Sequence, residues 1–255
     1  MDLQKCAALV EYDGALFHGF QLQRDTRTVQ LELESALSGL SGGCGRVEGA
    51  SRTDTGVHAS GQVVSFWVKS GLSIRTVVQG MNYYLPGDVA LRGACFIDGG
   101  FDVRRRAVSR QYRYKVVQSG ARAPLSETAS LRVGHRLDVD EMRRACRALI
   151  GSHDFGAFAT ELDGTVASTV RVVHEAKVVV TGDVIEMWMT ANAFLRHQVR
   201  NTVGQLVRVG MGRCSADEFA ALVDSDRRSV AGPAAVARGL CLVKVSYDTP
   251  LGFAS

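Results

Sequence analysis

One short stretch of the sequence combines a base, a carboxylate, a turn-forming glycine and an imidazole. It reads Arg52-Thr53-Asp54-Thr55-Gly56-Val57-His58, and an apolar run typical of a strand follows from Gln62 to Val68. An Asp two residues before a Gly indicates a tight turn. Such a turn can hold one carboxylate at a sheet edge with little freedom, which suits a reacting group. Taken alone, the stretch favours a plainer role, in which Asp54 hydrogen-bonds its own backbone and Arg52 is solvated.

A second candidate feature is the densest basic segment of the chain. Its cations are Arg104, Arg105, Arg106, Arg110, Arg113 and Lys115, interleaved with Phe101, Tyr112 and Tyr114. The alternation from Gln111 to Gln118 predicts a strand with both tyrosines on one face. Basic groups beside aromatic rings suit a single-stranded nucleic acid or a flipped base. A solvated, charged edge strand is the alternative.

A third feature is a long helix expected from about Phe194 to Val209. Arg196, Arg200 and Arg208 recur at multiples of four residues, on a stripe beside the apolar side. These arginines are either solvated, as helix arginines usually are, or partly buried. Gly204 supports the second alternative, because a glycine lets the helix pack closely against another element.

The elements that position these features alternate between strands and helices. Strands are expected at 6–12, 62–68, 88–97, 111–118, 169–180, 184–190 and 240–247, and helices after the N-caps Thr28, Ser73, Asp138 and Ser215. Gly99-Gly100 marks a boundary between an N-terminal half, 1–100, and a C-terminal half, 101–255. Hairpins mixed with crossover helices predict an α+β protein, in which helices cover one face of a mostly antiparallel sheet.

Composition narrows the class of protein. The 255 residues, 46% of them hydrophobic, suffice for a large core. No apolar run approaches the roughly 18 residues of a membrane span, and the N-terminus lacks a signal-peptide core, so we expect a cytoplasmic protein. The six cysteines are scattered without a metal-binding spacing and fit small buried residues. Of the 30 basic residues only five are lysine, so arginine, which binds phosphate bidentately, supplies 25.

Five motifs in order carry a resemblance to a known family. They are Tyr12-Asp13-Gly14 with Gly19-Phe20-Gln21-Leu22-Gln23 and Thr28-Val29-Gln30, Arg52 to Ala59, Arg110-Gln111-Tyr112-Arg113-Tyr114, Phe194 to Asn201 with Val203-Gly204, and Ala231-Gly232-Pro233 with Arg238-Gly239-Leu240. Over nearly its whole length the chain resembles the tRNA pseudouridine synthase A (TruA) family of bacterial RNA-modifying enzymes.

The resemblance implies a fold, an activity and partners. The fold is the pseudouridine synthase fold, two pseudo-symmetric α+β halves sharing one continuous sheet. The activity is isomerisation of uridine to pseudouridine in the tRNA anticodon arm, at positions 38, 39 and 40 in tRNA numbering, by a homodimer without a cofactor or metal. The catalytic residues it implies are Asp54, Arg200 and Tyr112, and the RNA-binding residues are Arg52, Arg104, Arg105, Arg110 and Arg196.

The sequence departs from the family pattern at several positions. Ser51 stands where Gly is usual, Thr55 where Ala is usual, Gln198 where Met is usual, and Asp102-Val103 replaces the more common His-Ala. None of these changes removes a reacting group. They bear on the range of substrates more than on the type of reaction.

The implied reaction suits a single carboxylate. It breaks the N1–C1′ bond, turns the uracil and rejoins it through C5, and the target base must first be flipped out of its stack. Asp54 either attacks C1′ or removes a ribose proton to start a glycal route. Both roles need an ionised carboxylate, which the neighbouring cation that the resemblance assigns to Arg200 would favour. Arg52 would fill the gap left by the base, and Tyr112 would stack on the uracil.

The sequence also bears on three other functions. A nucleoside or glycoside hydrolase using Asp54 normally needs a second carboxylate, which the turn does not offer. A non-catalytic RNA-binding module would use the arginine and tyrosine segment alone. A zinc-dependent base deaminase is excluded, because neither H-x-E nor P-C-x-x-C occurs. His18, His58 and His197 are expected to be hydrogen-bonded structural residues.

Overall fold

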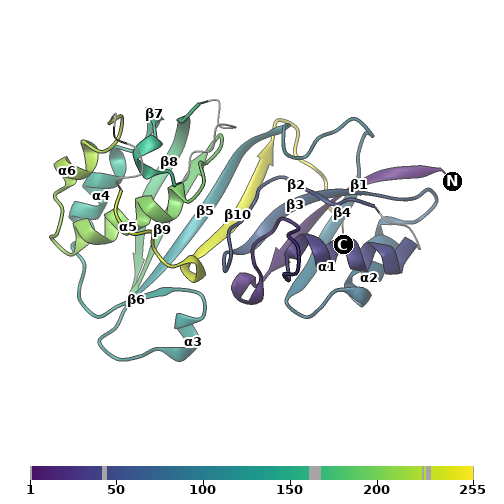
Figure 1. The fold of residues 1–255 in the computed structure, drawn as a ribbon, viewed down its shortest axis with the longest axis horizontal. Coiled ribbons are helices and arrows are strands. Elements are labelled where there is room, and N and C mark those ends of the chain that lie inside the picture. Colours follow the sequence, from purple (N-terminus) through teal and green to yellow (C-terminus); the bar gives the residue numbers. More distant parts are fainter. Residues whose placement is uncertain (1, 42–44, 161–167, 226, 228–230, 255) are drawn as a thin grey trace. The chain divides into compact units, whose positions relative to one another are not determined.

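The computed structural model describes residues 2–41, 45–160, 168–225, 227 and 231–254. The chain forms two compact units (Figure 1). The first contains Met1–Val108 and Leu242–Ser255, and the second contains Ser109–Cys241. The last strand therefore belongs mostly to the first unit. The division into domains at residues 100 and 101 stays a prediction.

The sheet of the first unit is built around its N-terminal strand. β1 (Leu3–Tyr12) pairs antiparallel with β3 (His58–Lys69) and with β4 (Val89–Phe96). The strand order is β4-β1-β3-β10, with β10 spanning Leu240–Tyr247, and the short β2 (Glu48–Gly49) pairs with β3. Every strand expected in this unit is present, because their apolar residues, such as Cys6 and Phe66, are fully buried.

Two helices of the first unit pack against each other. They are α1 (Val29–Ser41) and α2 (Ile74–Tyr84), and Figure 1 shows them side by side. The predicted N-caps are confirmed, since the Thr28 hydroxyl accepts from the Leu31 N–H and the Ser73 hydroxyl accepts from the Thr76 N–H. The expected end of α1 at Gly42-Gly43 lies outside the described residues, as does Cys44.

The strands of the second unit follow the order β5-β9-β8-β7, and neighbouring strands in this order pair antiparallel. These strands are β5 (Ala107–Gln118), β7 (Gly151–Asp154), β8 (Val170–Thr181) and β9 (Val184–Ala191), with β6 (Leu131–Val133) parallel to β5. The predicted hairpin between β8 and β9 is confirmed. Gly182 sits in its turn at φ +59°.

The helices of the second unit are α3 (Pro124–Glu127), α4 (Val139–Arg147), α5 (Gln198–Gly210) and α6 (Ala216–Ala220). Short 3₁₀ turns occur at Gly14–Leu16, Gly156–Phe158 and Ala237–Gly239. α5 packs against both α4 and α6. The capping box expected at Ser215 and Glu218 is confirmed. The α+β class predicted from the sequence is confirmed as well.

One helix boundary was predicted wrongly. α5 begins at Gln198 rather than near Phe194, because His197 takes a left-handed backbone conformation at φ 60° that a helix cannot include. The Gln198 side chain accepts from the Leu195 N–H and so fixes the preceding loop. Arg196 therefore lies in that loop and not on a helical stripe with Arg200. No helix in the described part of the chain is long and apolar enough to cross a membrane.

Candidate active site

The tight turn expected around Asp54 is present. The Val57 N–H donates to the Asp54 carbonyl over 3.1 Å, which closes a four-residue turn. Gly56, the third residue of the turn, has φ +76°, a value that a glycine adopts without strain. Asp54, the first residue of this turn, is half-buried, and β3 follows directly after the turn. The sequence from 54 to 57 therefore fixes the backbone that presents the carboxylate.

The segment after β1 forms a cradle for this turn. The Phe20 N–H donates to the Thr53 carbonyl, and the Gly56 N–H donates to the Phe17 carbonyl. The Tyr12 hydroxyl lies 2.7 Å from the Thr53 hydroxyl. A side chain at Gly19, which has φ +91°, would press against the Thr53 carbonyl at 2.8 Å. The motifs around Gly19 and Asp54 thus form one structure, although about 30 residues separate them.

His58 has the structural surroundings that we expected of it. Its Nδ1 atom lies 3.1 Å from the Gly14 nitrogen and 3.0 Å from the Asp13 carboxylate. The side chain is only 13% exposed. It joins the start of β3 to the turn after β1, and so supports the other end of the Asp54 turn.

Three arginines of the first unit gather charge near this turn. Arg46, Arg52 and Arg104 are all exposed. The pKa of Arg52 is lowered, by partial burial and then by repulsion from Arg104 and Arg46. Like charges held near each other repel in the free protein, and a phosphate bound among them would relieve the repulsion. This arginine group (Arg46, Arg52 and Arg104) is a candidate site for an RNA backbone.

The loop that carries Arg104 is held in place just before its basic run. Asp102 accepts through Oδ1 from the backbone N–H groups of Arg104 and Arg105, and these bonds lower the pKa of Asp102. The buried Lys5 ammonium donates to the Phe101 carbonyl over 2.9 Å. Asp102, one of the departures from the family pattern, thus builds the turn that presents the exposed Arg104 and Arg105.

Tyr112 lies on the predicted strand, β5, in the second unit. Tyr112 and Tyr114 share one face of β5, as the alternation predicted, and both are buried, with Tyr112 6% exposed. The Tyr112 ring makes an edge contact with Phe194 at 5.3 Å between centroids. Arg110, also buried, donates through Nη1 to the Asn192 carbonyl. A base can stack on Tyr112 only if part of the surrounding chain moves.

Arg200 is half-buried on α5, as the alternative based on Gly204 predicted. Its Nε donates to the Ala235 carbonyl over 2.8 Å, and the Ala235 N–H donates back to the Arg200 carbonyl. A side chain on Gly204 would collide with the Pro233 carbonyl, so only glycine permits this approach. The close packing fixes the direction in which Arg200 leaves the helix.

Tyr114 also contacts the loop at residues 233–236, which packs against Gly204 and Arg200. Its hydroxyl donates to the Val236 carbonyl over 2.8 Å, and Gly239 leaves room for its ring. Burial raises the pKa of Tyr114 far above its usual range, while the nearby cations Arg200 and Arg238 act in the opposite direction. The hydroxyl therefore stays protonated and keeps its hydrogen bond at neutral pH.

The structure gathers the predicted residues in two places. Arg52, Asp54, Arg104 and Arg105 belong to the first unit, and Arg110, Tyr112, Arg196 and Arg200 belong to the second. The expected pairing of Asp54 with Arg200 joins residues of different units and stays a prediction. Sequence reasoning missed Arg46, because an isolated arginine after a glycine-rich stretch of sequence carries no motif or periodicity.

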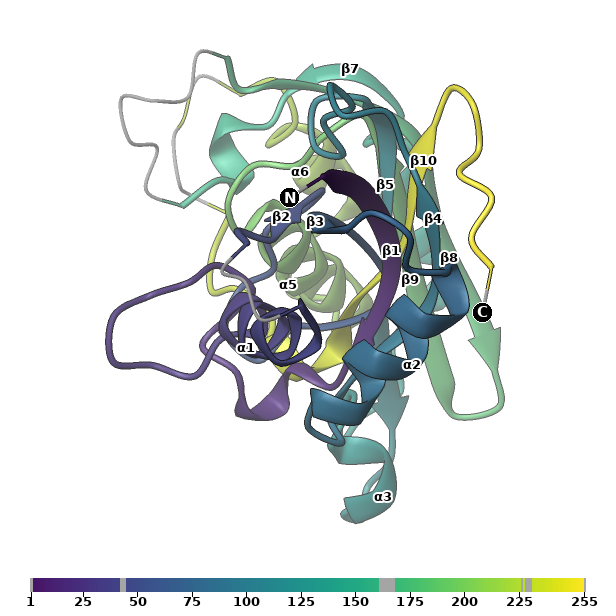
Figure 2. The same ribbon diagram turned by 90° about the vertical axis from the view of Figure 1, so that its right-hand side faces the viewer.

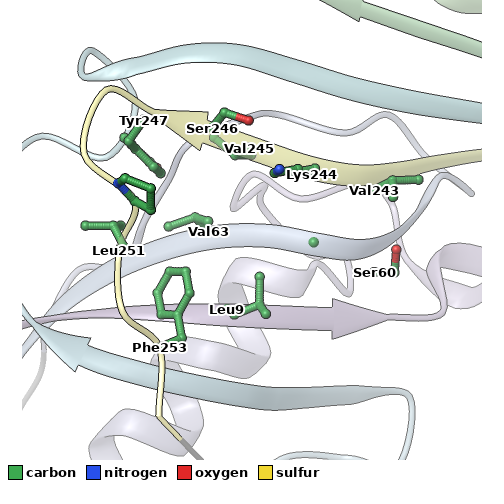
Figure 3. Close-up of a pocket in the computed structure, with 12 residues that line it drawn as sticks. Leu9, Ser60, Val63, Val243, Lys244, Val245, Ser246, Tyr247, Leu251 and Phe253 are labelled. Carbon is green, nitrogen blue, oxygen red and sulfur yellow. The ribbon is translucent and has the colours of Figure 1, made fainter.

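A cavity of about 410 Å³ lies elsewhere in the first unit. Figure 2 shows the segment after β10 running along the side of the strands away from α1. In Figure 3, Phe253 of that segment faces the strands that carry Leu9 and Val63. None of the predicted site residues lines this cavity. Among the described residues, no cluster of His, Cys, Asp and Glu side chains could hold a metal ion.

Comparison with known proteins supplies the family. A family model described as tRNA pseudouridine synthase matches residues 8–103 and 145–248. The match includes Arg52, Asp54, Arg196 and Arg200, whereas the segment with Arg104, Arg105, Arg110 and Tyr112 lies between its two parts.

Curated relatives match along nearly their whole length. A tRNA pseudouridine synthase A from Geobacter sp. (strain M21) is 38% identical over 240 residues, covering 94% of this chain and 97% of the relative. One from Roseiflexus sp. (strain RS-1) is 41% identical, covering 96% and 91%, and one from Myxococcus xanthus is 40% identical, covering 93% and 90%. With the α+β fold and the Asp54 turn, these matches show that the chain belongs to the tRNA pseudouridine synthase family.

Proposed function

We propose that Asp54 is the reacting carboxylate with which this tRNA pseudouridine synthase isomerises uridine in the anticodon arm, at positions 38, 39 and 40. The observation that carries the proposal is the presentation of Asp54. Asp54 begins a turn that Phe17 holds through its backbone, and the preceding Thr53 is held by Phe20 and Tyr12, beside the arginine group. A fixed acid next to cations suits a base that has been flipped out of an RNA strand.

The chemistry needs one ionised carboxylate. The N1–C1′ bond of the uridine breaks, the uracil turns, and a C5–C1′ bond forms while the C5 proton is lost and N1 gains a proton. Atoms and electrons balance without an oxidant or a leaving group. Asp54 acts either by attacking C1′, which gives a covalent ester, or by taking a ribose proton, which gives a glycal. In both routes the carboxylate returns to its starting state.

The arginines divide into two roles by their exposure. Arg52, Arg104, Arg105 and Arg196 are exposed and can reach phosphates, and Arg52 is the one to fill the gap left by the flipped base. Arg110 is buried and bonded to the Asn192 carbonyl, so its role in RNA binding is to hold the strand that carries Tyr112.

We propose that Arg200 and Tyr112 act in the catalytic site together with Asp54. Arg200 supplies the cation that keeps Asp54 ionised, and its bond to Ala235 sets its direction. Tyr112 stacks on the uracil once the RNA has displaced part of what covers its ring. We also propose that the enzyme acts as a homodimer in the cytoplasm, as the family resemblance implies.

Replacing Asp54 with asparagine tests the proposed site. Asp54→Asn keeps the shape of the side chain and the turn, but it removes the negative charge that either route needs. We expect no pseudouridine in unmodified tRNA transcript, mapped by carbodiimide treatment and reverse-transcription stops, while the dissociation constant for tRNA changes less than about threefold. Wild-type enzyme should give new stops only in the anticodon arm.

Asp25→Asn is the matched control. Asp25 lies in the same unit, and both it and its ion-pair partner Arg24 are almost fully exposed, at 89% and 95%. We expect wild-type turnover from this variant. Normal turnover by Asp54→Asn would rule out Asp54 as the reacting group, and stops outside the anticodon arm would overturn the assigned positions.

A further inference from the structure

Arg27 is a densely bonded cation of the first unit, and none of the assigned roles includes it. Its Nη1 and Nη2 atoms donate to the two carboxylate oxygens of Asp88 over 2.7 and 2.9 Å. Its Nε donates to Glu32 over 2.7 Å. The guanidinium also lies 4.3 Å from the centre of the Phe17 ring. Three of its N–H groups and one face of the guanidinium therefore have partners that lysine could not satisfy in the same way.

The partners of Arg27 connect three elements. Glu32 is in the first turn of α1, Asp88 precedes β4, and Phe17 follows the 3₁₀ turn at Gly14–Leu16. The hydrogen bonds to Asp88 and Glu32 raise the pKa of Arg27 above its already high value, so the cation is permanent. Its side chain is only 33% exposed. Such a charge-assisted, bidentate arrangement holds its partners in a fixed geometry.

Two of these partners are linked to the Asp54 turn, Phe17 directly and Asp88 through Asp13 and His58. The Phe17 ring under the guanidinium is 1% exposed, and the Phe17 carbonyl accepts from the Gly56 N–H inside the turn. The Asp88 carbonyl accepts from the Asp13 N–H over 3.0 Å, and the Asp13 carboxylate lies 3.0 Å from Nδ1 of His58, just after the turn. Arg27 is thus linked to the second half of the turn along two paths, one through Phe17 to Gly56 and one through Asp88 and Asp13 to His58.

We propose that Arg27 is a positioning residue, which sets the place of the Asp54 carboxylate through Phe17 and Asp88. This inference rests on Asp54 as the reacting group. Because a reacting atom displaced by about 1 Å can cost on the order of 100-fold in rate, loosening these links slows the chemical step. It leaves tRNA affinity in place, since the guanidinium is engaged by Asp88 and Glu32 and the arginine group is built from other residues.

The test is a series of variants in single-turnover assays with saturating tRNA transcript. Arg27→Lys keeps the charge but not the bidentate geometry, and Asp88→Asn removes the matching carboxylate. We expect each to lower the rate of pseudouridine formation about tenfold or more while the dissociation constant for tRNA stays within about twofold. Arg27→Met, which loses both charge and geometry, should be slower than Arg27→Lys. Rates are taken well below the melting temperature and divided by the folded fraction.

Arg92→Lys is the matched control, because the exposed Arg92 pairs with Glu11 over 3.5 Å on the neighbouring strands. It should keep the wild-type rate. A purely structural role for Arg27 would lower the melting temperature and leave the rate per folded molecule unchanged, and that result overturns the inference. Loss of turnover in Asp54→Asn with full turnover in Arg27→Lys and Asp88→Asn overturns this inference alone. Full turnover in Asp54→Asn removes the proposed site and this inference with it.

Discussion

Arginines of the same basic segment differ in how exposed they are in the structure. Arg104 and Arg105 are exposed on a turn that Asp102 caps, whereas Arg110 is buried against the Asn192 carbonyl. The strand alternation explains the difference, because Arg110 lies on the same face of β5 as Tyr112 and Tyr114. The type of residue therefore indicated a polyanion partner, but only its position on a face decides whether it can touch one.

His153 is a second residue whose partners determine its charge. Its Nδ1 lies 2.6 Å from the Asp224 carboxylate, and its Nε2 lies 3.0 Å from the Ile150 carbonyl. Both partners are acceptors, so both ring nitrogens bond fully only when the imidazole is protonated. Burial works to lower the pKa of His153, but the bonds to Asp224 and Ile150 raise it above its ordinary 6.5.

This arrangement predicts a pH-dependent stabilisation. Because the folded state holds the proton more tightly, the contribution is fully present below the ordinary pKa and is lost as the pH rises through the raised, folded-state pKa. The gap in urea midpoint between wild type and His153→Gln should therefore be larger at about pH 6 than at about pH 9. His174→Gln, at an exposed position, should show no such change. A gap that stays constant with pH would mean that folding does not raise the pKa of His153.

At the scale of elements, local signals predicted most of the fold. Apolar periodicity and caps placed β1, β3, α1, α2, α4 and β10, because burial and capping act over a few residues. The start of α5 was wrong, since the left-handed His197 and the side-chain bond from Gln198 to Leu195 leave no periodic trace. The cradle around Asp54 was also beyond local reasoning, because its bonds join residues far apart in the sequence.

The approach of α5 to the loop at Pro233 gives a prediction for the helix. Gly204→Ala should raise helix propensity by about 1 kcal/mol, but its methyl group would meet the Pro233 carbonyl oxygen, a backbone atom that cannot turn away. Overpacking of this kind costs roughly 1–3 kcal/mol, so we expect a net loss of stability. Turnover should fall too, because Arg200 bonds to Ala235 across the same approach. Urea unfolding and single-turnover rates measure both effects.

Gly80→Ala in α2 is the matched comparison. A methyl group there would meet only the tip of the Leu40 side chain, which can rotate. We expect Gly80→Ala to be neutral or stabilising in the same unfolding measurement. Equal stability changes for the two variants would show that the carbonyl at Pro233 yields, and that the close approach is not enforced by the backbone.

At the scale of the whole molecule, the net charge of +4 is a poor guide to where the protein can bind RNA. Acidic residues compensate arginines at several places in the described chain, as in the pairs of Arg27 with Asp88, Arg132 with Glu127 and Arg144 with Glu141. In the arginine group, by contrast, the positive charges of Arg104 and Arg46 repel that of Arg52. Local excess of positive charge, rather than the total, therefore identifies the surface on which a phosphate backbone would bind.

This distinction can be measured through the salt dependence of tRNA binding. Each phosphate contact that is lost reduces the slope of log K against log salt by about 1. Arg46→Gln should therefore weaken binding and flatten the slope by about that amount, although no motif marks Arg46. Arg75→Gln removes the same charge from an exposed position on α2 and should leave the slope unchanged. Equal effects from both variants would mean that tRNA responds to the net charge of the protein, and that the arginine group is not a binding site.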